Sequence, residues 1–236
     1  MTSRTIKRFY QQASAAPVAG GYGVELDGRP VRTPGKALLM VPREALAEAL
    51  AAEWAAQEKV VKPESMALTG LACTAIDRMT PRRDEMVGEV ADYGRTDALC
   101  YRVDRPPELV ARQEATWQPL LDWAVQALDA PLATTTGILL VDQPESALAA
   151  LGRAVAVHDD LELAALASAV KASGSLVIAL ALSHGRIDPQ TAFEAAELHE
   201  SHQIERWGGD PEAERRRASV RVDLDAAGLF LTLLRS

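Results

Sequence analysis

The side chains best suited to chemistry are concentrated in residues 194–207, whose sequence is EAAELHESHQIERW. His199 and His202 are three positions apart, so both imidazoles would project from one side of a helix. Zinc hydrolases of the HExxH type place their histidines four apart with a glutamate between them, so that both rings reach one ion. Because this spacing is wrong and two histidines leave the ligand set short, we predict no metal site. A metal-assisted hydrolase that uses His199 and His202 is the alternative function.

The same segment carries polar side chains at intervals of three. Glu197, Glu200 and Gln203 would share one face of a helix. Unpaired carboxylates are costly in a packed interior, so this face is expected at the protein surface. From the residues alone, such a face is either solvated or a binding surface for a partner.

Other catalytic patterns are missing from the sequence. It has no GxSxG nucleophile elbow, and Cys73 and Cys100 form neither a CxxC pair nor a known catalytic signature. Gly20, Gly21 and Gly23 match neither GxGxxG nor GxxxxGKS or GxxxxGKT, the loops that hold nucleotide phosphates. We therefore predict that the chain is not an enzyme.

Charge and hydropathy exclude two further classes. The formal net charge is -8 and the sequence pI is about 5.1, which argues against a nucleic-acid groove because phosphate binding needs clustered lysine and arginine. The most apolar run, residues 175–183, is too short to span a bilayer, which takes roughly 20 apolar residues. Residues 1–16 are basic and lack acids, as in organelle transit peptides. They contain no long apolar stretch of the kind that directs secretion, so a cytoplasmic location is the default expectation.

The N-terminal part predicts short strands followed by helices. Residues 22–26 alternate and lead into an Asp-Gly turn, a strong hairpin signal, and residues 37–41 form a second apolar run. From Pro42 the apolar spacing becomes helical, with Trp54 on the apolar side. Trp54 is therefore expected to be buried and to support the fold.

A double proline at positions 106 and 107 separates this region from one in which nearly every segment has helical period. We predict an α+β protein, with a small irregular β-sheet in an N-terminal domain, residues 1–104, and an all-α C-terminal domain, residues 105–236. Helices are expected to start near Pro107, Pro144, Asp160, Ser173, Pro189, Pro211 and Asp223, and the helix from Pro189 is expected to continue to Trp207.

Eight motifs, taken in order, resemble the family of ATP synthase assembly chaperones dedicated to the alpha subunit. They are KRFY (7–10), LDGRPVRTP (26–34), EW with Gln57, LTGLACTAIDR (68–78), TDALCYR (96–102), WQP (117–119), KASGSLVIALAL (171–182) and ELHESHQIERWG (197–208). No single motif is diagnostic, but their shared order along the chain is specific.

The resemblance implies a two-domain, monomeric chaperone that binds the unassembled alpha subunit of F-type ATP synthase without a cofactor. It prevents aggregation of that subunit and promotes assembly of the catalytic head. Onto this sequence the family pattern places a partner-binding group in the helical domain and a structural residue, Trp54, in the N-terminal domain. The partner-binding residues implied are Glu197, Glu200, Gln203, Arg206 and Trp207.

Overall fold

A computed structural model describes residues 6–137 and 139–236. The chain forms two compact units, one of Met1–Arg83, Asp160–Ala165 and Leu229–Ser236 and the other of Asp84–Asp159 and Leu166–Gly228. The domain boundary expected between residues 104 and 105 stays a prediction, which limited proteolysis can check. The first five residues of the basic N-terminal segment lie outside the described residues.

The first unit contains a four-stranded antiparallel sheet around β3 (Gly21–Leu26). β2 (Ala13–Val18) pairs with one edge of β3, while β4 (Arg29–Pro30) and β5 (Met40–Val41) share the other edge. The Asp-Gly hairpin predicted from the sequence joins β3 to β4. Its two turn residues have positive φ angles of 48° and 75°, which Asp and Gly tolerate better than other residues.

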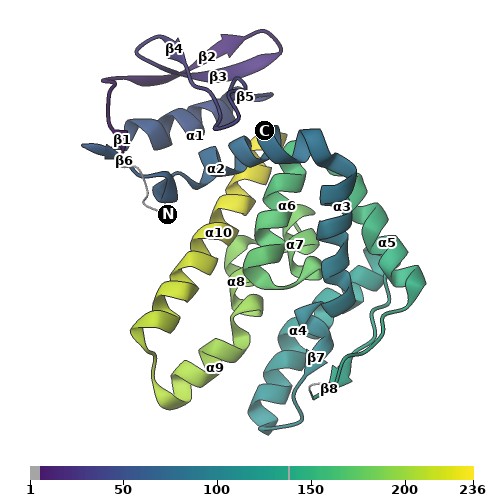
Figure 1. Cartoon of the computed structure of the whole chain (residues 1–236). Helices are drawn as coiled ribbons and strands as arrows, with labels where there is room; N and C mark the ends of the chain where they lie inside the picture. The colour runs from purple at the N-terminus through teal and green to yellow at the C-terminus, as the bar shows by residue number, and fades with distance from the viewer. Residues whose placement is uncertain (1–5, 138) are drawn as a thin grey trace. The chain divides into compact units, whose positions relative to one another are not determined.

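Helix α1 (Glu44–Ala55) packs against this sheet and buries Leu46, Ala47, Leu50 and Ala51 (Figure 1). Pro42 precedes the helix by two residues, since Arg43 is its N-cap, so the predicted start at this proline was slightly early. A second, two-stranded sheet pairs β1 (Ile6–Lys7) with β6 (Val60–Val61). The unit continues through η1 (Pro63–Ser65), α2 (Ala67–Thr74), the π-helical turn η2 (Ala75–Met79) and η3 (Thr80–Arg82).

The second unit is predominantly helical. Its short elements are η4 (Asp92–Thr96), η5 (Ala98–Cys100) and the two-residue strands β7 (Tyr101–Arg102) and β8 (Thr135–Thr136). Its helices include α3 (Arg83–Ala91), α4 (Pro107–Leu128), α5 (Glu145–Ala156), α7 (Leu176–Ser183), α8 (Pro189–Ala196) and α9 (Leu198–Trp207). Most residues of α6 (Asp160–Ser173) and α10 (Pro211–Arg235) also belong to it. Together the two units confirm the predicted α+β fold class.

The buried helix α7 is anchored by Asp97, from the TDALCYR motif. All eight residues of α7 are buried. The Asp97 carboxylate accepts hydrogen bonds from the backbone N–H groups of Val177 at 2.9 Å and Leu99 at 3.0 Å. Burial raises the pKa of the Asp97 carboxyl. The first backbone N–H groups of a helix have no partner within the helix and need such acceptors. Asp97 therefore fixes the start of α7 to the segment between η4 and η5.

Two helix boundaries differ from the sequence predictions. The helix expected from Pro189 to Trp207 breaks into α8 and α9 at Glu197, whose φ and ψ are -100° and 18°. Conversely, α10 runs without interruption past Asp223, where a new helix start was expected. An aspartate such as Asp223 inside an amphipathic segment is therefore not enough to predict a helix boundary. No helix of the described residues is both long and apolar enough to cross a membrane.

Candidate functional site

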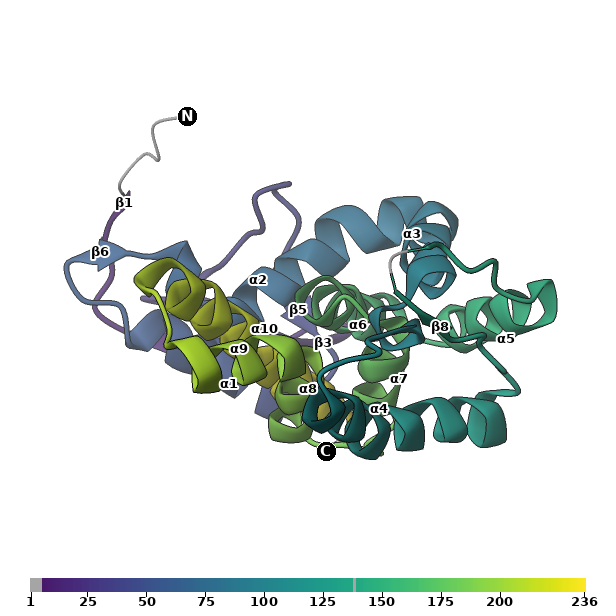
Figure 2. The same cartoon turned by 90° about the horizontal axis from the view of Figure 1, so that it is seen from below.

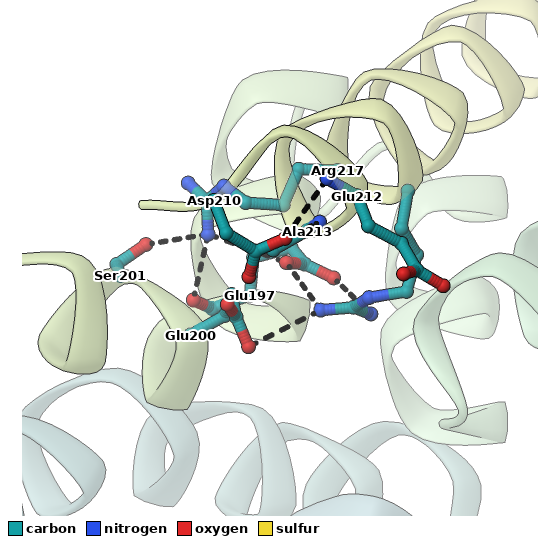
Figure 3. Close-up of polar contacts among 8 residues, drawn as sticks. Glu197, Glu200, Ser201, Asp210, Glu212, Ala213 and Arg217 are labelled. Carbon is teal, nitrogen blue, oxygen red and sulfur yellow. Dashed lines mark hydrogen bonds and ion pairs between the residues drawn. The ribbon is translucent and has the colours of Figure 1, made fainter. Parts of the chain in front are cut away.

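Glu197, at the break between α8 and α9, is buried, with only 4% of its surface exposed. Its carboxylate oxygens lie 3.2 Å from an Nη atom of Arg216 and 3.2 Å from an Nη atom of Arg217, both on α10 (Figure 3). The backbone carbonyl of Glu197 also accepts a hydrogen bond from Arg217. Two arginines thus offset the cost of burying this carboxylate and tie the start of α9 to α10.

Glu200 and Ser201 extend the same cluster toward solvent. The Glu200 carboxylate lies 3.4 Å from Arg216, and 26% of its side chain is exposed. The Ser201 hydroxyl accepts a hydrogen bond of 3.1 Å from Arg217. Asp210 caps the start of α10 by accepting from the N–H groups of residues 212 and 213. Both views of the ribbon show α10 returning beside α9 after this cap (Figure 1, Figure 2).

The last turn of α9 is the exposed part of the predicted site. Gln203 and Arg206 are exposed, and Trp207 has 74% of its surface in solvent. Arg206 pairs with Glu108 on α4 at 3.2 Å, and its guanidinium carbon lies 5.9 Å from the Trp207 ring centroid. A second ion pair, of 2.7 Å, joins Arg112 on α4 to Glu205. Exposed ion pairs contribute little stability, so these side chains can exchange partners.

The histidines of α9 face inward. His199 packs against Trp117 of α4, with ring centroids 5.1 Å apart, and its ring Nε2 contacts the Gln113 side chain. Burial, and secondarily His202, lower the pKa of His199. His202 is buried, and neither ring nitrogen has a hydrogen-bond partner among the described residues. Within the described ranges, no group of three or more His, Cys, Asp or Glu side chains is placed to hold a metal ion.

The structure therefore divides the predicted site into two parts. Glu197 lies within the ion-pair cluster, Glu200 lies at its edge, and Gln203, Arg206 and Trp207 form an exposed group that we call the α9 end. Sequence reasoning missed the arginines of α10 that organise the cluster. Their signal was the run RRR at 215–217, but nothing in the sequence showed that it returns to α9.

Trp54 lies in the other unit, on α1, and is partly buried. Its ring packs edge-on against Tyr10 with centroids 5.8 Å apart, and the Tyr10 hydroxyl donates to its backbone carbonyl.

Glu53 and Gln57, the neighbours of Trp54 in the same motif, also have structural partners. The Glu53 carboxylate accepts from the N–H groups of Leu68 and residue 69, each at 2.8 Å, and so caps α2. The side-chain amide oxygen (Oε1) of Gln57 accepts a hydrogen bond of 2.7 Å from the N–H of Lys62.

Trp54→Arg is expected to lower the free energy of unfolding by about 3 kcal/mol, because it removes aromatic packing and brings a cation against the core. Trp54→Phe is the matched control. The indole N–H of Trp54 has no acceptor among the described residues, so its removal should cost about 1 kcal/mol or less. Urea unfolding followed by circular dichroism measures both. Equal midpoints for Trp54→Arg and the wild type would refute a structural role.

Comparison with known proteins adds independent information. Residues 7–125 match the family model described as ATP12 chaperone protein. The chain is 23% identical over 216 residues to the mitochondrial protein atp12 of Schizosaccharomyces pombe, covering 86% of this chain and 74% of that protein. It resembles the crystal structure of Atp12 from Paracoccus denitrificans with a TM-score of 0.90 and 42% identity, covering 98% and 99% of the two chains. A structure from Agrobacterium tumefaciens, described as a chaperone, has a TM-score of 0.89 and 39% identity, covering 98% and 85%.

Proposed function

The chain belongs to the ATP12 chaperone family, which serves ATP synthase assembly, and on that premise we propose that it binds the unassembled alpha subunit of F-type ATP synthase. Binding would cover the apolar subunit interface until a neighbouring subunit arrives. Such interfaces associate non-specifically while they are exposed. The proposal requires neither a cofactor nor a catalytic step. It places the chaperone, as a monomer, in a bacterial cytoplasm or a mitochondrial matrix, compartments where this assembly takes place.

The observation that supports a binding role is the exposed Trp207 at the α9 end. A tryptophan with 74% of its surface in water is an unusual choice for a solvated helix end. Tryptophan and arginine are enriched among residues that dominate the energy of protein interfaces. Arg206 and Gln203, beside it, are also exposed and supply polar contacts. We therefore assign partner contact to the α9 end and to Glu200.

Release is as necessary as capture for an assembly chaperone. Arg206 of the α9 end already has a partner within the chain, Glu108, and the neighbouring Glu205 pairs with Arg112. These pairs can break when a client binds and form again when it leaves. An interface made of such exchangeable contacts around one aromatic residue suits a transient complex better than a permanent apolar seal.

The experiment is capture of purified subunits by the immobilised chaperone. We expect it to retain the free alpha subunit, retain little of the free beta subunit, and reduce light scattering when alpha alone is warmed. The beta subunit is a demanding control because it occupies the same ring and exposes comparable interfaces. Equal retention of the two subunits, or no effect on scattering, would reject the proposed client.

A further inference from the structure

The first unit contains a cavity of about 570 Å³, within the range typical of ligand pockets, far along the sequence from the α9 end. Its aromatic wall is formed by Phe9, Tyr10 and Trp54, and strand β4 contributes both of its residues, Arg29 and Pro30, to the lining. Phe9 has 71% of its surface in solvent, although it makes an edge-to-face contact with Tyr10. Phe9 and Tyr10 of this wall belong to the KRFY motif, for which the function proposed above gives no role.

The backbone beside Phe9 is held in place by Arg8. Its guanidinium donates to the carbonyls of Tyr10 at 3.1 Å, Gln11 at 2.9 Å and Ala55 at 3.2 Å, and its carbon lies 4.7 Å from the Tyr10 ring centroid. The wall is therefore fixed to the end of α1 before any ligand arrives. A preformed wall lowers the entropy cost of binding.

The charges around the cavity are unbalanced. Among the described residues, Asp27 is the one acidic side chain in the lining. Its carboxylate accepts hydrogen bonds from the N–H of Gln11, which is shared between both oxygens, and from the N–H of Gln12. Arg29 and Arg32 are exposed, and neither has a carboxylate partner within the described chain. Arg32 donates a hydrogen bond of 2.9 Å to the backbone carbonyl of Lys36, which leaves its charge without an anionic partner among the described residues. Two such arginines beside an aromatic wall are notable in a protein whose formal charge is -8. The cavity complements a ligand that is both anionic and apolar.

We propose that this cavity is a docking groove for an acidic peptide segment of the client, with an apolar side chain against Phe9 and Trp54 and a carboxylate between Arg29 and Arg32. The identity of the client rests on the proposed function, whereas the chemistry of the segment rests on the cavity. Arginine is well suited to this contact because its planar guanidinium binds a carboxylate through two hydrogen bonds. A second contact on the same client would raise overall affinity by linkage.

The test uses the full-length chain and short fluorescent peptides. One peptide alternates glutamate with leucine, a second has glutamine in place of glutamate, and decanoate serves as a small anionic amphiphile. Fluorescence anisotropy should show binding of the acidic peptide, weakened by salt, and at least tenfold weaker binding of the glutamine peptide. The double variant Arg29→Glu/Arg32→Glu should weaken binding of the acidic peptide by at least tenfold, and Phe9→Ser should also weaken it.

Two matched controls separate the groove from general charge effects and from misfolding. Lys59→Glu/Arg78→Glu changes the net charge by the same amount as Arg29→Glu/Arg32→Glu. Its two positions are exposed residues of the same unit that do not line the cavity, so peptide binding should be unchanged. Arg29→Gln/Arg32→Gln should retain the wild-type melting curve and still bind the peptide weakly.

Each arm decides a different question. Undiminished peptide binding by both arginine double variants would overturn the groove, and decanoate binding as tightly as the peptide would assign the cavity to small amphiphiles instead. Failure of the wild-type chain to capture the alpha subunit would reject the proposed client, but it would leave the peptide result to decide the groove.

Discussion

Glu197→Ala is expected to lower the free energy of unfolding by about 3 kcal/mol, the scale on which removal of one partner destabilises a buried ion pair. The carboxylate is buried and contacts two arginines, and only 19% of the Arg217 side chain is exposed. Without Glu197, Arg217 would retain a charge in a poorly solvated position, and the start of α9 would lose its tie to α10. Urea unfolding monitored by far-ultraviolet circular dichroism measures the effect.

Glu197→Gln is the appropriate control for this prediction. It keeps the length of the side chain and one acceptor oxygen, so it should destabilise the fold by roughly half as much or less. If Glu197→Ala unfolds at the wild-type urea concentration but fails to capture the alpha subunit, Glu197 contacts the client directly, as its family position implies. If it loses neither stability nor capture, the cluster has no measurable role.

The prediction of the fold succeeded where local signals decide the structure. The Asp-Gly pair predicted the β3–β4 hairpin because few residues accept the positive φ angles of that turn. Pro107, Asp160, Pro189 and Pro211 begin helices as expected, since proline and capping residues act within one turn of the helix start. These features depend on only a few neighbouring residues, so one sequence is sufficient to reveal them.

The site was harder to predict because it depends on distant residues. The spacing of Glu197 and Glu200 indicates a common helical face, but spacing cannot tell whether another helix covers that face. Here α10 packs back against this face and brings to Glu197 two arginines that lie 19 and 20 positions later in the chain. The cost of burying the Glu197 carboxylate is offset by a tertiary contact, and a local sequence pattern cannot predict such a contact. The capping of α2 by Glu53, 15 and 16 positions earlier, was missed for the same reason.

Glu200→Lys is expected to weaken capture of the alpha subunit by at least tenfold while changing the free energy of unfolding by about 1 kcal/mol or less. The fold should tolerate the change because Glu200 lies at the edge of the cluster, and Arg216, its partner at 3.4 Å, retains Glu197. Binding should not tolerate it, because lysine reverses the charge next to the α9 end and leaves two neighbouring cations facing the client. Thermal melting and subunit capture, measured on the same preparation, separate the two effects.

Glu89→Lys supplies the matched control, since Glu89 is an exposed residue of α3 and the substitution changes the net charge by the same amount. It should melt and capture the alpha subunit like the wild type. The deficit of Glu200→Lys should also shrink as salt is added if it arises from repulsion at an accessible interface, because ions screen exposed charges within roughly 10 Å. A deficit that is independent of salt and accompanied by a lower melting temperature would show that Glu200 acts through the fold. Wild-type melting with undiminished capture would remove Glu200 from the binding surface and leave the α9 end to explain recognition alone.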